Sequence, residues 1–108
     1  MVYGSVADKD VDAVLHLMPA GVTYVFTQAH GKRALPAEEV RDRYISYCEE
    51  IGRPTDDVHC SGTVIDAVNL AYGLAASIKE SDPDALPLIY IGGSTYVVSE
   101  AVAMLKGR

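Results

Sequence analysis

Small and polar residues that could bind an anion follow the last apolar run of the chain. Gly92, Gly93 and Ser94 come directly after the run at 86–91, and Tyr96 lies two residues further on. Two glycines let the backbone approach a ligand closely, and the free N–H groups at a helix start favour a carboxylate or a phosphate. The hydroxyls of Ser94 and Tyr96 could add two donors. The same residues would serve equally well as a tight strand-to-helix turn with Ser94 as the helix cap, so both interpretations stay open.

A basic loop is predicted at residues 28–35, after the second apolar run. It carries Lys32 and Arg33, and His30 lies close to them in the sequence. Arg33 is the better candidate for binding a carboxylate or a phosphate, because its planar guanidinium can donate two parallel hydrogen bonds. His30 could titrate with a bound anion.

A third charged group follows the first apolar run, where the sequence reads Asp8, Lys9 and Asp10. Two carboxylates and an ammonium at this place could contact magnesium-bound phosphates or a partner domain. The simpler interpretation is that Asp8 or Asp10 caps a helix and that the other charges face water.

None of the usual catalytic or metal-binding patterns accompanies these residues. His16, His30 and His59 are scattered, without the spaced partners that a zinc site needs. The chain has no Gly-x-x-x-x-Gly-Lys-Ser/Thr run and no nucleophile elbow. Cys48 and Cys60 form no Cys-x-x-Cys pair, so we interpret them as buried or bystander thiols in a reducing compartment. We predict no catalytic residue and no bound metal in these 108 residues, and a cytoplasmic location.

Composition excludes two classes of partner. The chain has 108 residues with 15 Asp and Glu against 9 Lys and Arg, a formal net charge of -6. Nucleic-acid binding needs clustered Lys and Arg, and no such cluster is present. The most apolar stretch, 86–105, is interrupted by glycine, proline and glutamate, so we expect no membrane span.

Short β-rich runs alternate along the chain with longer helical stripes. Strands are predicted at 2–6, 23–27, 58–60 and 86–91. Each is followed by a helix whose apolar stripe comprises, in order, Val11, Val14, Leu15 and Met18; Val40, Tyr44, Tyr47 or Cys48, and Ile51; Val64, Val68, Ala71, Ala75 and Ile78; and Val97, Val98, Ala101, Val102 and Leu105. This alternation predicts a single α/β domain over 1–108, with a mostly parallel sheet covered by helices on both faces.

The expected sheet positions the candidate residues, because the carboxyl ends of parallel strands open to one edge, where ligands bind. We expect the unbroken apolar strands at 2–6 and 86–91 to be central, and the strand at 58–60 to lie nearer an edge. A response-regulator domain would need an aspartate after the third strand. Cys60 and Ser61 stand there, which excludes that interpretation.

Four segments of the chain resemble the C-terminal domain of bacterial dihydrofolate synthase/folylpolyglutamate synthase, a member of the Mur ligase family. They are residues 8–12 (DKDVD), 27–29 (TQA), 33–39 (RALPAEE) and 92–100 (GGSTYVVSE). The resemblance covers essentially the whole chain in order. It implies a Rossmann-like sheet in three αβα layers.

The resemblance also implies an activity for a longer protein. Members of this family are ATP-dependent amide ligases, in which a carboxylate of dihydropteroate or of a folate becomes an acyl phosphate that the amino group of L-glutamate attacks. ATP and Mg²⁺ are bound mainly by an N-terminal ATPase domain. Mapped onto this chain, Ser94 and Tyr96 are candidates for the glutamate site, and Asp8, Lys9 and Arg33 face the interdomain cleft on the nucleotide side.

The chain departs from the full family pattern because it has neither the phosphate-binding loop nor the Asp-Gly-Ala-His-Asn run of the domain junction. We therefore expect these residues alone to be inactive, since acyl-phosphate formation needs two domains to orient the substrates and exclude water. An upstream strand that is absent here would leave a sheet edge exposed, which predicts some self-association. The alternative is a freestanding, non-catalytic α/β module that binds a small anionic ligand or a protein partner.

Overall fold

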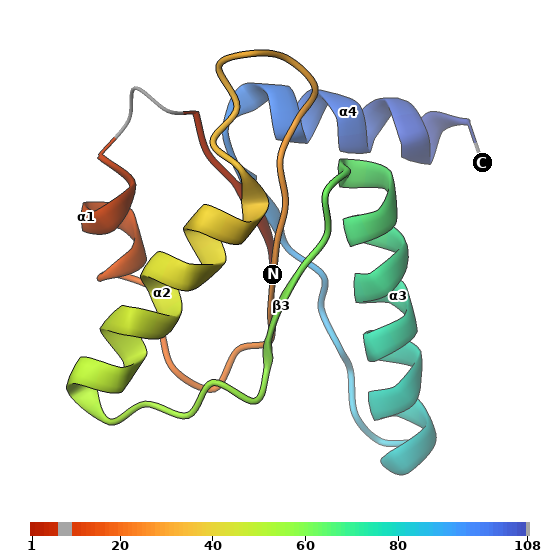
Figure 1. Cartoon of the computed structure of the whole chain (residues 1–108). Helices are drawn as coiled ribbons and strands as arrows, with labels where there is room; N and C mark the ends of the chain where they lie inside the picture. Colours follow the sequence, from red (N-terminus) through yellow and green to blue (C-terminus); the bar gives the residue numbers. More distant parts are fainter. Residues whose placement is uncertain (7–9, 108) are drawn as a thin grey trace.

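Four short parallel strands form one sheet in the described residues, with the order β3-β2-β1-β4 (Figure 1). The structure is a computed structural model that describes residues 1–6 and 10–107. The strands are β1 (Val2–Gly4), β2 (Tyr24–Phe26), β3 (Val58–Cys60) and β4 (Ile91–Gly93). All three strand pairs are parallel. The predicted parallel sheet is confirmed. β1 and β2 are shorter than the predicted strands at 2–6 and 23–27, and β3 has the predicted bounds.

Helices cover both faces of this sheet. They are α1 (Val11–Leu15), α2 (Ala37–Ile51), α3 (Val64–Ser81) and α4 (Thr95–Lys106). Figure 1 shows α1 and α2 on one side of the strands, α3 on the other side and α4 across the top of the view. Buried residues of α4 pack with those of α3. The predicted α/β class with three αβα layers is confirmed. No helix in the described part of the chain is both long enough and apolar enough to cross a membrane.

The helix ends follow the capping signals in the sequence. Side-chain oxygens of Asp10, Thr63 and Ser94 accept hydrogen bonds from backbone N–H groups in the first turns of α1, α3 and α4. Gly52 ends α2 in the left-handed conformation, with φ of 72°. Of the two residues predicted to cap the first helix, Asp10 forms the capping hydrogen bond.

An aromatic cluster fills the core between the sheet and α2. The ring of Tyr44 lies 5.2 Å from that of Tyr24 and 5.5 Å from that of Phe26, measured between centroids. The Tyr24 hydroxyl donates a hydrogen bond to the carbonyl oxygen of Pro19 at 2.6 Å. Because burial disfavours the phenolate, it raises the pKa of Tyr24 to about 12.

The opposite face of the sheet packs on α3 and α4 with small and β-branched side chains. Fully or almost fully buried residues of this layer are Val2, Val25, Val64, Ala67, Val68, Val97 and Ala101. Small residues let α3 and α4 approach the strands closely, which brings the start of α4 next to the end of β1.

The prediction that the run at 86–91 is a central strand is wrong. Only its last residue belongs to β4, and β4 lies at the edge of the sheet beside β1. Leu86 and Leu88 are 89% and 90% exposed. An unbroken apolar run resembles a buried strand in the sequence, but here alternate side chains point away from the core. The strand at 2–6 is central and the strand at 58–60 is an edge, as predicted.

Several stripe residues are also exposed against expectation. Val14, Ile51, Ile78, Val98 and Val102 are all at least about a third exposed, whereas the centres of the stripes are buried. For α3 the reason is length. Eighteen helical residues span about 27 Å, and a three-residue strand spans about 10 Å. The far half of α3, including Ile78, therefore extends beyond the strands that would cover it.

Candidate functional site

A cavity of about 200 Å³ lies at the carboxyl edge of the sheet. It is lined by Val6, Ala29, His30, Gly31, Lys32, Arg33, Ala34, Ser94 and Tyr96. These residues come from the segment after β1, from the loop between β2 and α2, and from the start of α4. The structure therefore brings together Arg33, Ser94 and Tyr96, which the sequence analysis predicted separately.

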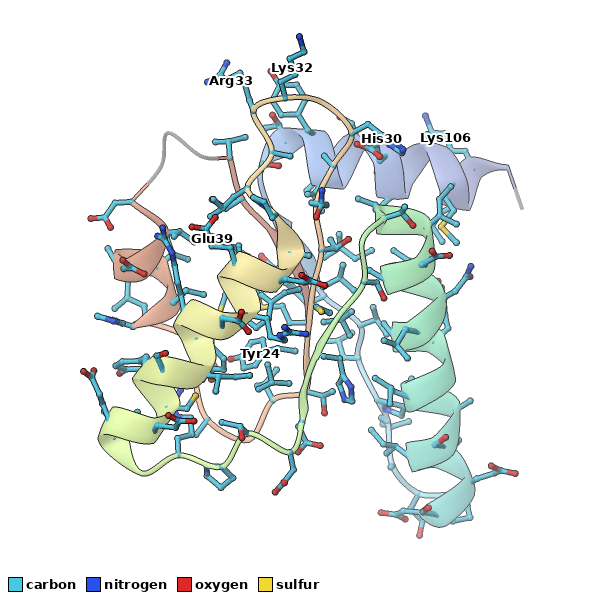
Figure 2. All side chains as sticks on the ribbon, in the orientation of Figure 1. Tyr24, His30, Lys32, Arg33, Glu39 and Lys106 are labelled. Carbon is cyan, nitrogen blue, oxygen red and sulfur yellow. The ribbon has the colours of Figure 1, made fainter. Side chains whose placement is uncertain are left out.

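The loop at 28–35, called the basic loop below, forms one wall of the cavity. Its far end is fixed to the segment after β1, because Leu35 donates its N–H to the carbonyl oxygen of Ser5 at 2.9 Å and Ala34 pairs with Val6. Its near end is fixed to α2, where the side-chain oxygen of Gln28 accepts the N–H of Ala37 at 2.9 Å. Figure 2 shows Lys32 and Arg33 at the outer end of the loop.

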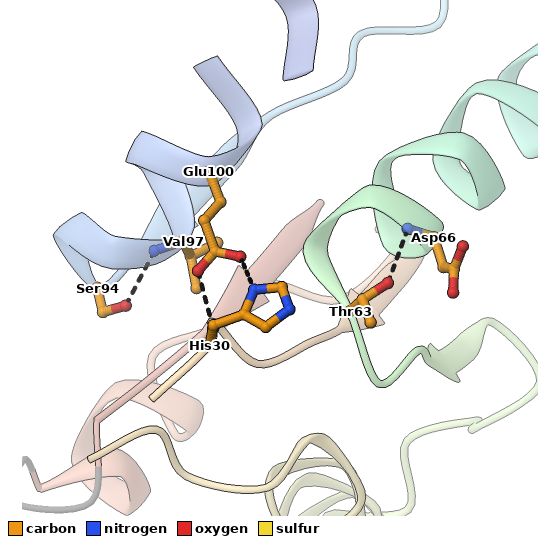
Figure 3. Close-up of polar contacts among 6 residues, drawn as sticks. All are labelled: His30, Thr63, Asp66, Ser94, Val97 and Glu100. Carbon is orange, nitrogen blue, oxygen red and sulfur yellow. Dashed lines mark hydrogen bonds and ion pairs between the residues drawn. The ribbon is translucent and has the colours of Figure 1, made fainter. Parts of the chain in front are cut away.

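Ser94 lies at the junction of β4 and α4 and is almost fully buried. Its hydroxyl oxygen accepts the N–H of Val97 at 3.3 Å, so it caps α4 (Figure 3). A serine hydroxyl that accepts such a bond keeps its own O–H group for donation. The capping role, one of the two interpretations left open by the sequence, is thus present, and it still leaves a donor at the cavity wall.

Tyr96 and the basic loop supply the other polar groups of the cavity. Tyr96 stands in the first turn of α4, lines the cavity and is half exposed. Lys32 and Arg33 line it from the opposite element and are exposed. Two cationic side chains and two hydroxyls around one small cavity favour an anionic ligand with oxygen acceptors.

Gly92 and Gly93 are placed differently from the other candidates. In the described residues they do not line the cavity, and they pair with Tyr3 and Gly4 in the sheet. The N–H of Ser94 donates to the carbonyl oxygen of Gly4 at 2.9 Å. These contacts bring α4 close to β1. The role of Gly92 and Gly93 as a backbone anion site stays a prediction.

Asp8 and Lys9, two of the predicted site residues, lie outside the described residues. Of the other histidines, His16 stacks on Tyr47 with 4.2 Å between ring centroids, and His59 lies within β3. Among the described residues no group of three or more His, Cys, Asp and Glu side chains is arranged to hold a metal ion.

Sequence reasoning missed two residues that shape the site. Gln28 caps α2 in place of Pro36, which has no side chain that can do so. Glu100 of α4 binds His30 of the basic loop with both carboxylate oxygens. Glu100 is the one acidic residue of a helix that is otherwise mostly apolar. This is the signal that could have identified it.

Comparison with known proteins identifies one kind of relative. No protein-family model and no curated protein matches the chain. A solved structure of Mycobacterium tuberculosis folylpolyglutamate synthase, from a study of complexes with ADP and AMPPCP, matches with a TM-score of 0.73 and 30% identity. A second, of the same organism's folylpolyglutamate synthase complexed with ADP, matches with a TM-score of 0.69 and 26% identity.

Both matches cover 99% of this chain and 23% of the solved chain. The chain therefore spans less than a quarter of the length of the proteins that it resembles. The resemblance to folylpolyglutamate synthase predicted from the four sequence segments is confirmed.

Proposed function

Because the fold and sequence match folylpolyglutamate synthase along 99% of the chain, we propose that the chain is the C-terminal domain of an ATP-dependent amide ligase. The longer protein adds L-glutamate to dihydropteroate, to tetrahydrofolate or to both, through an acyl-phosphate intermediate. The structural match over the whole chain carries this proposal.

The cavity supports a role in binding glutamate. A volume of about 200 Å³ is below the roughly 300–1,000 Å³ of sites for drug-sized ligands, so it suits an amino acid better than a whole folate. Ser94 and Tyr96 would donate hydrogen bonds to the glutamate. Arg33, with Asp8 and Lys9, would face the nucleotide side of the cleft between this domain and its N-terminal ATPase domain.

ATP and Mg²⁺ would be bound mainly by the N-terminal ATPase domain. The related structures were solved with ADP and AMPPCP, which supports nucleotide binding by the longer protein. The described residues of this chain fit a supporting role, because Lys32 and Arg33 offer cations to phosphate but no cluster of metal ligands is present among those residues. The two cysteines are free thiols, which supports the proposed cytoplasmic location.

The reading frame that encodes the chain provides the first test. A phosphate-binding loop far upstream, with an Asp-Gly-Ala-His-Asn run close to Val2, is the expected result. Glutamate-dependent ATP consumption by the whole protein would then follow. An open reading frame that begins at Met1 would overturn the ligase function and leave the freestanding binding module as the function to test.

Steady-state kinetics of the whole protein test the assigned residues. Ser94→Ala and Tyr96→Phe should each raise the KM for glutamate about tenfold or more, because each removes a donor to a charged ligand. Ser99→Ala and Tyr90→Phe, which alter exposed residues away from the cavity, are the matched controls. Ser94→Thr keeps a capping hydroxyl and should retain most of the affinity, which separates binding from folding. Normal glutamate kinetics in both site variants would refute the site while leaving the ligase function intact.

A further inference from the structure

Glu100 binds one residue of the basic loop with both of its carboxylate oxygens. Oε2 accepts the backbone N–H of His30 at 2.8 Å, and Oε1 lies 2.6 Å from Nδ1 of the His30 imidazole (Figure 3). These two contacts, called the His30–Glu100 clasp below, join residues 70 positions apart in the sequence. A carboxylate that holds a backbone group and a side chain of the same residue fixes that residue in position as well as in orientation.

The clasp completes the attachment of the basic loop. Leu35 and Ala34 tie the far side of the loop to the segment after β1, and Gln28 ties its first residue to α2. The clasp ties the loop to α4 at His30, directly before the exposed end of the loop. Between these attachments lie Gly31, Lys32 and Arg33, and all three line the cavity.

The end of the loop depends on this attachment more than its flanks do. Gly31 has a φ of 119°. Glycine adopts this conformation at little cost in energy, and for the same reason its backbone changes readily to other conformations. Lys32 is exposed, so packing contributes little to fixing its backbone. Exposed loops with few buried contacts open at low free-energy cost. The two hydrogen bonds of His30 therefore restrain the loop directly before the turn that carries the two cations.

Glu100 is suited to this task by its surroundings. Its side chain is 28% exposed, whereas that of His30 is 78% exposed, so the carboxylate is the more fixed partner. It projects from the middle of α4, the helix whose first turn supplies Ser94 and Tyr96 to the same cavity. The clasp thus links the two walls of the cavity to each other.

We propose that Glu100 is a positioning residue, which holds the basic loop through His30 and so places Lys32 and Arg33 over the cavity to receive an anionic ligand. The identity of that ligand as glutamate or a phosphate rests on the proposed function. Glu100 itself does not touch the ligand. Its effect is to lower the conformational entropy that the loop must lose on binding.

The first measurement is independent of the function. Backbone ¹⁵N relaxation of Gly31 and Lys32 is recorded in the ligand-free chain. Glu100→Ala should make both amides markedly more mobile on the nanosecond timescale, and Glu100→Gln should have a smaller effect because its amide oxygen still accepts the His30 N–H. Glu50→Ala, on an exposed face of α2, is the matched control. Unchanged relaxation in Glu100→Ala would overturn the inference even if the ligase function holds.

The second measurement separates positioning from stability. In the whole protein Glu100→Ala should raise the KM for glutamate about three- to tenfold with little change in kcat, from the loss of two exposed hydrogen bonds. His30→Ala should have a smaller effect, and the double variant should be no worse than Glu100→Ala alone. A mobile loop with an unchanged KM would overturn the positioning role.

A wild-type protein without glutamate-dependent turnover would instead refute the proposed function. Inorganic phosphate titrated into the 108-residue chain then decides the positioning role. A weaker affinity in Glu100→Ala than in Glu50→Ala would support it. Equal affinities, or binding by neither the wild type nor the variants, would overturn it.

Discussion

The carbonyl oxygen of Gly4 occupies the space that a Cβ atom at Gly93 would need. The two residues are partners in the parallel pairing of β1 with β4, and Gly93 has a φ of 102°. The same carbonyl oxygen accepts the N–H of Ser94 at 2.9 Å. This close approach of two strands determines where α4 begins, and thereby where Ser94 and Tyr96 meet the basic loop.

Gly93→Ala should therefore destabilise the fold strongly. The new methyl group collides with backbone that cannot move aside, and the positive φ adds strain. We expect the free energy of unfolding in urea to fall by about 2 kcal/mol or more. Gly62→Ala is the control, because no atom lies within 4 Å of a Cβ there. Equal stability of the two variants would contradict the close approach.

Replacing one buried valine of α3 tests the packing of the second helical layer. Val68 is fully buried against α4 and the sheet, whereas Ile65 on the same helix is half exposed. Val68→Ala should lower the free energy of unfolding by about 2 kcal/mol, through lost burial and a small cavity. Ile65→Ala should cost clearly less. If Ile65→Ala lowered stability more than Val68→Ala in thermal or urea unfolding, α3 would present a different face to the core.

Tyr24 makes the stability of the fold depend on pH in the alkaline range. Since burial raises the pKa of Tyr24 from 10.0 to about 12, the unfolded chain loses this proton before the folded chain does. The contribution is fully present below pH 10 and is lost as the pH rises through 12. The stability advantage of the wild type over Tyr24→Phe should therefore shrink by up to about 3 kcal/mol between pH 8 and pH 12.

Urea unfolding at a series of pH values measures this difference. Phe26→Leu disturbs the same aromatic cluster without removing a titrating group, so its difference from the wild type should stay constant. A constant difference for Tyr24→Phe as well would show that the Tyr24 phenol is not protected from ionisation.

Local signals in the sequence were sufficient for most elements. Pro36, Glu38 and Glu39 lie at the start of α2 and Gly52 at its end. Residues of these types signal helix limits in a sequence, because they act within one turn of the helix. The convergence of Arg33, Ser94 and Tyr96 on one cavity was also predictable, since parallel strands place their following loops at one edge.

Which distant residues contact each other was not marked by any local signal, although Glu100 by itself stands out as the one acidic residue of α4. The clasp joins His30 to Glu100 across 70 residues, and neither residue stands in a pattern that requires the other. The position of β4 at the edge was missed for a related reason. The apolar run at 86–91 has the composition of a buried strand, and only the packing of the whole domain decides how many neighbours a strand receives.

The exposed stripe along residues 86–90 leads to the last prediction. Leu86, Leu88 and Tyr90 are 89%, 90% and 62% exposed, while Ile89 between them packs on the core beside α3. This alternation is that of a strand, and Tyr90 already accepts the N–H of Val2 at 2.8 Å. In the described sheet nothing pairs with the outer side of this segment. An apolar edge of this kind favours pairing with another chain.

The chain should accordingly self-associate at high concentration, and Leu86→Ser with Leu88→Ser should suppress this without loss of stability, since neither side chain is buried. Leu17→Ser is the control, because Leu17 is just as exposed but lies away from the sheet edge. Light scattering measures the mass of each variant. A mass of one chain for the wild type at high concentration would refute the prediction. If only the Leu17 variant had a smaller mass, the contact between chains would involve the end of α1 and not the edge of β4.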